Sequence, residues 1–302
     1  MVPPRREPSP TQDAREALLA WDRAHRVDYP WRRTESDPYA TLVSEVMLQQ
    51  TQASRVAPIF EAFLGRFPTV ESLAAAPRRD VLTAWAGLGY HRRAVALHET
   101  ARAIVRDHDG SVPAEPAALR ALPGVGAYTA AAVASIAFGA PVATVDTNVR
   151  KVIARLAFGA ERDEITARQA DDTAAAWLDR DRPGEWNQAV MNLGRDVCRT
   201  RPRCDACPLA GVCRFRASGR HGRPSVVRQP AFHGSSRQLR GEVVAALRAR
   251  NPSTLGGIAG STERPVARVA DAVAGLHRDG VVEASPAALD GRPRGRVRFP
   301  EG

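Results

Sequence analysis

Apolar residues recur every three or four positions along most of the chain between residues 14 and 216. This spacing predicts amphipathic helices, and it is found in the segments 13–26, 41–67, 70–76, 78–88, 91–108 and 116–122. Proline and glycine separate the segments, as at Pro68, Pro77 and Gly110. No clear alternating strand pattern occurs before residue 220. We therefore expect an all-α body of roughly ten or more short helices.

The last quarter of the chain has a different pattern. A stretch rich in Gly, Pro, Arg and Ser predicts a linker over 219–236. Helical patterns at 237–250, 253–260 and 263–280 then precede two short strand patterns at 281–285 and 296–300. Three helices followed by a two-stranded wing indicate a small winged-helix-like module over 237–302. Helix-turn-helix modules commonly bind DNA, and the pattern leaves open whether this module does so or is only a packing cap.

Charge adds a functional constraint. The formal net charge is +10, and among 43 basic residues only Lys151 is a lysine. A basic protein of this size most simply binds a polyanion, and nucleic acid is the usual one. The N-terminal residues 1–13 predict a disordered tail and not a secretory signal, and no apolar run is long enough to span a membrane. We expect a cytoplasmic, nucleoid-associated monomer.

All four cysteines lie in one window, CRTRPRCDACPLAGVC. Clustered cysteines in a cytosolic chain bind metal more often than they form disulfides. Four thiolates suit zinc or a [4Fe–4S] cluster. The single C-x2-C pair, flanked by gaps of five residues, favours an iron–sulfur cluster over a zinc knuckle.

Residues 121–138, ALPGVGAYTAAAVASIAF, predict two helices joined by a tight turn. Pro123 blocks continuation of the first helix, and Gly124 and Gly126 permit the turn. The second helix begins near Tyr128, and the backbone N–H groups at its start form an anion site. The pattern fits a helix-hairpin-helix motif that grips a DNA backbone, or an ordinary glycine-rich turn. Asp146 follows twenty residues after Gly126, where it either caps a helix starting near Thr147 or faces a substrate.

Hairpin, downstream Asp146 and cysteine window together resemble the iron–sulfur branch of the helix-hairpin-helix DNA glycosylases. SEVMLQQTQ (44–52) is similar to the corresponding helix of MutY-type adenine DNA glycosylases, which excise adenine mispaired with 8-oxoguanine. YPWR (29–32), GLGYHRRA (87–94), LPGVGAYTA (122–130) and VDTNVR (145–150) match the same family. The resemblance implies a six-helix barrel with the hairpin over 37–149 and a cluster lobe over 14–36 and 150–218.

The resemblance also implies a [4Fe–4S] cluster on Cys198, Cys204, Cys207 and Cys213. The implied substrate is double-stranded DNA containing an A·8-oxoG or A·G mispair. The implied catalytic residues are Glu45 as general acid and Asp146 as stabiliser of the sugar cation, with Tyr128 and Asn148 as hydrogen-bonding partners. Glu45 lies in the apolar stretch LVSEVML, where burial would raise its pKa. The implied adenine-pocket and DNA-binding residues are Trp31, Arg32, Gln49, Gln50, Thr51, Tyr90, His91, Arg92, Gly124, Val125, Gly126 and Arg150.

One difference from a sister group and two departures from the family pattern qualify this expectation. The sister endonuclease III group carries a lysine nucleophile where this chain has Tyr128, so we expect hydrolysis without β-lyase chemistry. The family's usual cysteine gaps are six, two and five, and the first gap here is one shorter. The chain after residue 230 is too short for the Nudix-like domain that reads 8-oxoguanine in longer members. The alternatives are therefore a thymine or uracil mismatch glycosylase, or a non-catalytic iron–sulfur DNA-binding protein.

Overall fold

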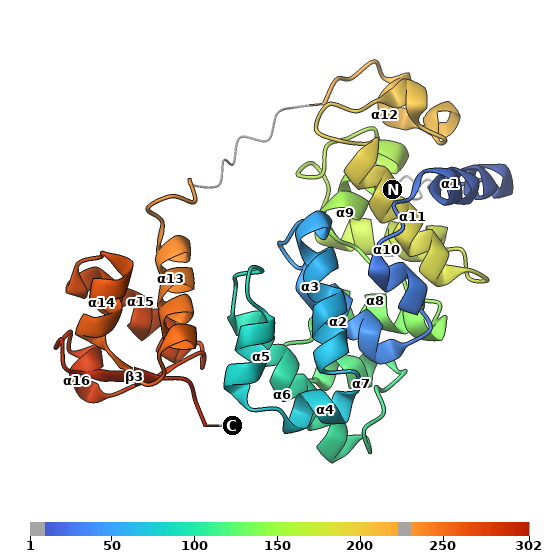
Figure 1. Ribbon diagram of the computed structural model, residues 1–302. Coiled ribbons are helices and arrows are strands. Elements are labelled where there is room, and N and C mark those ends of the chain that lie inside the picture. The colour runs from blue at the N-terminus through green and yellow to red at the C-terminus, as the bar shows by residue number, and fades with distance from the viewer. Residues whose placement is uncertain (1–9, 223–230, 302) are drawn as a thin grey trace, which may run out of the picture. The chain divides into compact units, whose positions relative to one another are not determined.

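The computed structural model describes residues 10–222 and 231–301, and these residues are mostly helical (Figure 1). The helices of the first part are α1 (Gln12–His25), α2 (Pro38–Leu48), α3 (Ala53–Arg66), α4 (Val70–Ala75), α5 (Arg78–Ala84), α6 (Arg92–Asp107), α7 (Pro116–Ala121), α8 (Ala127–Phe138), α9 (Thr147–Ile153), α10 (Ala167–Trp177), α11 (Pro183–Asp196) and α12 (Arg214–Ala217). Shorter helical turns are η1 (Pro30–Thr34), η2 (Ala154–Phe158), η3 (Cys204–Ala206) and η4 (Ala210–Val212).

Backbone packing divides the chain into two compact units. Unit 1 comprises Met1–Glu45, Pro113–Ala121 and Val125–Arg228, and unit 2 comprises Val46–Val112, Leu122–Gly124 and Gln229–Gly302. The domain boundaries expected from the sequence stay a prediction. Of the expected tail, residues 1–9 lie outside the described part, and α1 already begins at Gln12 because Thr11 caps it. Residues 223–230 of the expected linker also lie outside the described part.

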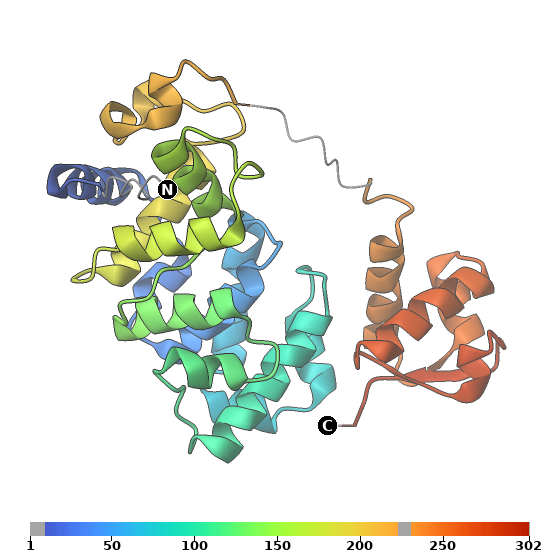
Figure 2. The ribbon, with the colours of Figure 1, turned by 180° about the vertical axis from the view of Figure 1, so that it is seen from behind.

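Helix α11 is the centre of unit 1. It packs against α1, α8 and α9, and α9 in turn packs against α10 (Figure 2). Their shared apolar core includes Leu18, Trp186 and Leu193. One polar pair is buried in this core, where Asn192 Nδ2 donates to Asp22 Oδ1 at 2.6 Å and links α11 to α1. Burial of such a satisfied pair fixes the register of two helices.

Unit 2 contains α3 to α6, with α6 packed against α4 and α5. Phe63 of α3 meets Trp85 edge-to-face, with ring centroids 6.0 Å apart. The sequence pattern predicted one helix over 41–67, and the structure breaks it into α2 and α3. The break falls at Gln50, whose φ of 55° lies in the left-handed region that ends a helix.

The C-terminal module of unit 2 contains α13 (Ser236–Ala249), β1 (Ser253–Thr254), α14 (Leu255–Thr262), α15 (Val266–Arg278), β2 (Glu283–Ala284), α16 (Pro286–Leu289) and β3 (Arg296–Arg298). The strands form an antiparallel sheet in the order β1-β3-β2. This is the element order and strand order of a winged helix, as the sequence predicted. Strand β1 and helix α16 are additions that their two- and four-residue lengths hid from periodicity. No helix in the described ranges is long and apolar enough to cross a membrane.

Candidate active site

Asp146 is the N-cap of α9. Its Oδ1 accepts a hydrogen bond from the backbone N–H of Val149 at 2.7 Å, so the capping role expected from the sequence is confirmed. Its second oxygen, Oδ2, accepts from Asn148 Nδ2 at 3.2 Å. Both oxygens are therefore held in place, and the half-buried carboxylate has a fixed orientation at the start of a helix.

Glu45 lies in α2 among the apolar side chains of that helix and is 9% exposed. Burial raises the pKa of this carboxyl to about 7, and the negative charge of nearby Asp146 raises it further; a hydrogen bond with Tyr128 and the positive charge of Arg32 act in the opposite direction. The pKa elevation expected from the apolar stretch is present. A carboxyl of this kind holds its proton near neutral pH and can deliver it to a substrate.

Tyr128, near the start of α8, completes this group. Besides its bond with Glu45, its hydroxyl contacts Met191 Sδ of α11 at 3.5 Å. Burial and the two neighbouring carboxyl groups raise the Tyr128 pKa well above its usual value, so the phenol stays neutral and can donate. An ionised carboxylate is a stronger acceptor than a thioether. The bond from the Tyr128 hydroxyl to Glu45 is therefore favoured over the sulfur contact when Glu45 loses its proton.

Two residues of α11 that the sequence did not reveal, Asn187 and Gly194, help to position Asp146. Asn187 of α11 donates to the Ser135 hydroxyl at 3.0 Å and the Val142 carbonyl at 2.9 Å, and it accepts from the Thr144 N–H at 3.2 Å. It thereby holds the segment that leads to Asp146. Gly194 of α11 lies against α9 so closely that a Cβ there would be 2.7 Å from the Asn148 Cβ. Side chain-to-backbone bonds between distant segments give no sequence signal.

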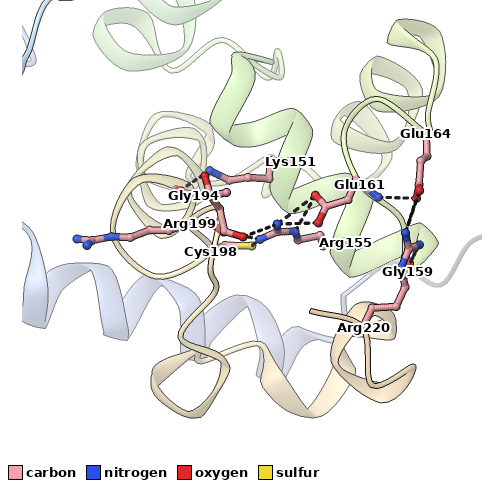
Figure 3. A network of polar contacts seen from close by, with 10 residues as sticks. Lys151, Arg155, Gly159, Glu161, Glu164, Gly194, Cys198, Arg199 and Arg220 are labelled. Atoms are coloured by element: carbon pink, nitrogen blue, oxygen red, sulfur yellow. Dashed lines mark hydrogen bonds and ion pairs between the residues drawn. The ribbon is translucent and has the colours of Figure 1, made fainter. Parts of the chain in front are cut away.

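Lys151 and Arg155 extend this region toward the cysteine window (Figure 3). Lys151 Nζ donates to the Gly194 carbonyl at 2.9 Å and lies 3.4 Å from Asn148 Oδ1. Arg155, whose side chain is 2% exposed, forms an ion pair with Glu161 at 2.9 Å. Its Nη1 lies 3.6 Å from Cys198 Sγ, and its guanidinium stacks on Phe215 with 4.9 Å to the ring centroid. Lys151, the only lysine of the chain, thus bonds to α11 four residues before Cys198, and the buried Arg155 lies against Cys198 itself.

The four cysteines line one hollow in unit 1, together with Arg155 and Phe215. In the described residues, no group of three or more His, Cys, Asp and Glu side chains stands close enough to hold a metal ion. A cubane cluster needs a wider spacing, because each thiolate binds a different iron atom. Four thiols around one hollow, with an arginine N–H directed at one sulfur, fit such an anionic cluster.

The residues expected to line an adenine pocket occupy η1. Trp31 stacks on Tyr29 with ring centroids 4.7 Å apart and an interplanar angle of 12°. The Arg32 side chain is 10% exposed and pairs with Glu35 at 3.4 Å. Burial lowers the Arg32 pKa, although Glu35 counteracts the shift. Arg32 still carries a positive charge that Glu45 senses.

In unit 2, two residues expected to contact the duplex have strained backbones. Gln50 has φ 55° and Tyr90 has φ 46°, and both are exposed. Such conformations are uncommon for residues other than glycine and persist only where the surroundings impose them. Thr51 and the half-buried Gln49 flank Gln50.

Arg93 of α6 imposes these conformations. Its Nη1 donates to the Val46 and Met47 carbonyls at 2.9 and 2.7 Å, and its Nη2 donates to Thr51 Oγ1 at 2.9 Å. The same Nη2 lies 3.3 Å from the Leu88 carbonyl, and the guanidinium is 5.5 Å from the Tyr90 ring. One side chain therefore ties the Gln50 turn to the Tyr90 turn. Its Nη1 and Nη2 donors are used inside the protein.

The remaining expected phosphate contacts differ in their surroundings. Arg92 is exposed, as a phosphate contact requires. His91 is 9% exposed, and burial together with nearby Arg240 lowers its pKa to about 4, so it is neutral at pH 7. A neutral buried imidazole does not fit the expected cationic contact. Arg150 donates from Nη2 to the Ile165 carbonyl, which uses part of its guanidinium inside unit 1.

The predicted hairpin is present, with α7 packed against α8. Gly124 has φ +74° and lies so close to α6 that a Cβ there would be 2.5 Å from the Ala96 Cβ. Gly126 is the N-cap of α8, with no side chain satisfying the first N–H groups of that helix. Val125, between them, is buried. The turn therefore presents backbone donors at a helix start, which is the arrangement that binds phosphate.

Comparison with known proteins agrees with this geometry. The family model for the HhH-GPD superfamily base excision DNA repair protein matches residues 43–177. An adenine DNA glycosylase of Mycolicibacterium smegmatis is 44% identical over 232 residues, which cover 76% of this chain and 79% of that protein. An adenine DNA glycosylase of Mycobacterium tuberculosis is 46% identical over 241 residues, 77% of each chain. The solved structure of a thermostable thymine-DNA glycosylase, 30% identical, superposes with a TM-score of 0.63 over 68% of this chain and 95% of that one.

The helical fold, the hairpin and the buried carboxyl group thus define a DNA glycosylase of the helix-hairpin-helix class, which works in base excision repair. Within that class the long alignments with mycobacterial proteins are decisive, and the chain belongs to the adenine DNA glycosylase family.

Proposed function

We propose that this chain is a monofunctional DNA glycosylase that acts as a monomer on double-stranded DNA and hydrolyses the N-glycosidic bond of adenine opposite 8-oxoguanine or guanine. The observation that carries the proposal is the group of Glu45, Tyr128 and Asp146. It combines one carboxyl that keeps its proton near pH 7 with a second that hydrogen bonds hold in place. The two mycobacterial relatives described above are adenine glycosylases.

The chemistry needs both carboxyl groups. The target adenine first leaves the base stack and enters a pocket. Protonated Glu45 delivers its proton to N7 of the adenine, which makes the base a better leaving group. The ionised Asp146 stabilises the positive charge that develops on the sugar, which is the two-carboxylate logic of glycoside hydrolysis. Asn148 orients Asp146, and Tyr128 adjusts the proton affinity of Glu45.

The cysteine hollow supports a [4Fe–4S] cluster on Cys198, Cys204, Cys207 and Cys213. When bound, the cluster would hold the window between α11 and α12 in one conformation and would contribute negative charge beside Arg155. The tests are the visible absorption spectrum and a metal analysis of the protein. An iron–sulfur absorption band and about four irons per chain would support this assignment. One zinc ion per chain would refute it.

The substrate assignment is tested with duplexes carrying A·8-oxoG, A·G, T·G or U·G, which are incubated with the protein under single-turnover conditions and then treated with hot alkali. We expect strand cleavage at adenine and none at thymine or uracil. Cleavage confined to T·G or U·G would contradict the proposal, and that outcome is included because the structural relative is a thymine-DNA glycosylase. Binding without any cleavage would indicate a non-catalytic protein.

Two variants separate catalysis from structure. Asp146→Asn keeps a side-chain oxygen that can cap α9 but removes the charge, so the fold should be retained and excision should fall. Glu45→Gln keeps the shape and removes the proton donor, and general acid catalysis contributes about 10²- to 10⁴-fold. Wild-type excision rates in either variant would remove that residue from the mechanism. Retained DNA affinity is the control for folding.

A further inference from the structure

The winged-helix module presents a helix-turn-helix and a wing on one small scaffold. Helices α14 and α15 are joined by a three-residue turn over 263–265, in which Glu263 adopts φ +53°. In such motifs the second helix enters the DNA major groove. The order of helices and strands alone does not show that this module binds DNA. The distribution of its charged side chains is a separate observation that points to DNA binding.

Residues 237–302 contain eleven arginines and seven acidic residues. The acidic groups neutralise arginines selectively. Arg240 pairs with Asp279, Arg264 pairs with Glu242 at 3.2 Å, and Arg298 pairs with Glu283 at 2.8 Å and Glu301 at 2.6 Å. These pairs leave another set of arginines without a nearby counter-charge.

This second set comprises Arg250, Arg268, Arg278, Arg294 and Arg296. All five are exposed, and none forms an ion pair within residues 10–222 and 231–301. Arg292, beside the last two, has only a 3.9 Å contact with Asp290, and both of those side chains are more than half exposed. Arg250 and Arg278 lie at the C-terminal ends of α13 and α15, whereas Arg268, Arg294 and Arg296, with Arg292, lie on the first turn of α15 and on the wing segment 292–296.

The wing holds these arginines in a regular array. Arg292, Arg294 and Arg296 alternate with Pro293 and Gly295, and β3, the central strand of the sheet, shows the exposed-buried-exposed pattern of a strand with one face in solvent. The Pro293 and Gly295 carbonyls accept from the Gly256 and Leu255 N–H groups, both at 2.8 Å, which anchors the wing on α14.

The wing also lies beside α15. A side chain at Gly291 would meet the Ala270 Cβ of α15 at 3.9 Å. The wing and the recognition helix therefore form one continuous surface. Residues with exposed guanidinium groups occupy both parts of it.

We propose that this surface, formed by the first half of α15 and the wing, is a second double-stranded DNA-binding site that grips the phosphate backbone without reading sequence. Apart from Arg268 and Asp271, the exposed face in the first half of α15 offers Ala267 and half-buried Ala270, which cannot hydrogen bond to base edges. Arg268, Arg292, Arg294 and Arg296 contact phosphates. The inference goes beyond the proposed excision reaction and does not depend on which base is removed.

Salt-dependent binding tests the proposal with the full-length protein and an undamaged duplex of roughly 40 base pairs, long enough for two separate contacts. Fluorescence anisotropy at several KCl concentrations gives the slope of log Kd against log salt. Arg294→Ala and Arg296→Ala should each reduce that slope by about 0.9, the value for one phosphate contact, and weaken binding equally on unrelated sequences. Arg106→Ala is the matched control, because that exposed arginine pairs with Asp107 at the C-terminal end of α6.

A gain-of-binding variant excludes simple misfolding. Asp271 is the one acidic residue on the exposed face of α15, so Asp271→Asn should tighten binding by about two- to fivefold at low salt, since it removes a repulsion of the size expected for an exposed charge. Slopes for Arg294→Ala and Arg296→Ala equal to that of Arg106→Ala, or an unchanged affinity in Asp271→Asn, would overturn the proposal. Because the duplex carries no mispair, a failure here is distinct from a failure of excision.

Discussion

The hydrogen bond between Tyr128 and Glu45 offers the sharpest test of the site. This bond lowers the Glu45 pKa, while burial and Asp146 raise it to a net value of about 7. Replacing Tyr128 with phenylalanine removes a donor that stabilises the ionised carboxylate. The proton therefore binds more tightly, and the Glu45 pKa must rise.

The size of the effect follows from the strength of the bond. A hydrogen bond to a charged group contributes about 1.5–3 kcal/mol, and about 1.4 kcal/mol corresponds to one pH unit. The Glu45 pKa in Tyr128→Phe should therefore rise by about one to two pH units. Since only protonated Glu45 can act as the acid, excision should persist to correspondingly higher pH.

The assay is the single-turnover excision rate between pH 5.5 and 9.5 with enzyme in excess over an A·8-oxoG duplex. The wild type should lose activity through a midpoint near pH 7, and Tyr128→Phe should shift that midpoint upward. Met191→Leu is the matched control, because it removes the 3.5 Å sulfur contact of the same hydroxyl without touching Glu45. A midpoint that is unchanged or lower in Tyr128→Phe would refute the reasoning.

Two further predictions concern stability. The rise of the Glu45 pKa from 4.5 to about 7 lowers the free energy of unfolding by about 3 kcal/mol once the pH exceeds 7, because Glu45 ionises more easily in the unfolded chain. In urea unfolding, Glu45→Gln should therefore be more stable than wild type at pH 8 but not at pH 4.5. A gain in stability that is independent of pH would contradict this cause. Gly194→Ala places a Cβ 2.7 Å from the Asn148 Cβ, so it should lower the free energy of unfolding by about 1–3 kcal/mol and slow excision. The control Gly65→Ala, with nothing within 4 Å of the new Cβ, should not destabilise the protein. Equal stability of the two variants in thermal unfolding would argue against the tight contact between α9 and α11.

Periodicity predicted most of the fold. Helices α4 to α7 begin and end within a few residues of the expected segments, because their amphipathic patterns are interrupted by proline or glycine. The break at Gln50 was missed, because glutamine carries no turn signal and the left-handed conformation comes from tertiary contacts. Short elements such as β1 and α16 form only because neighbouring segments pair with or pack on them.

The sequence predicted those site residues whose side-chain type the chemistry requires. It did not predict the residues that only hold other segments in place. Glu45 and Asp146 stand out because carboxyl groups are unusual in apolar surroundings, and burial of Glu45 has the expected electrostatic effect. Asn187 and Arg93 act through backbone carbonyls of remote segments, so no spacing along the chain reveals them. His91 was misjudged because burial, which the local sequence HRR does not reveal, removes its charge.

The Arg93 guanidinium has a consequence for binding kinetics. By bonding Val46, Met47 and Thr51 on one side and approaching the Leu88 carbonyl on the other, it orders two turns before any duplex arrives. A protein whose contact loops are already ordered loses less conformational entropy on association than one that must fold them around its ligand. For a DNA duplex that these turns contact, encounter and not the ordering of the turns would then set the association rate.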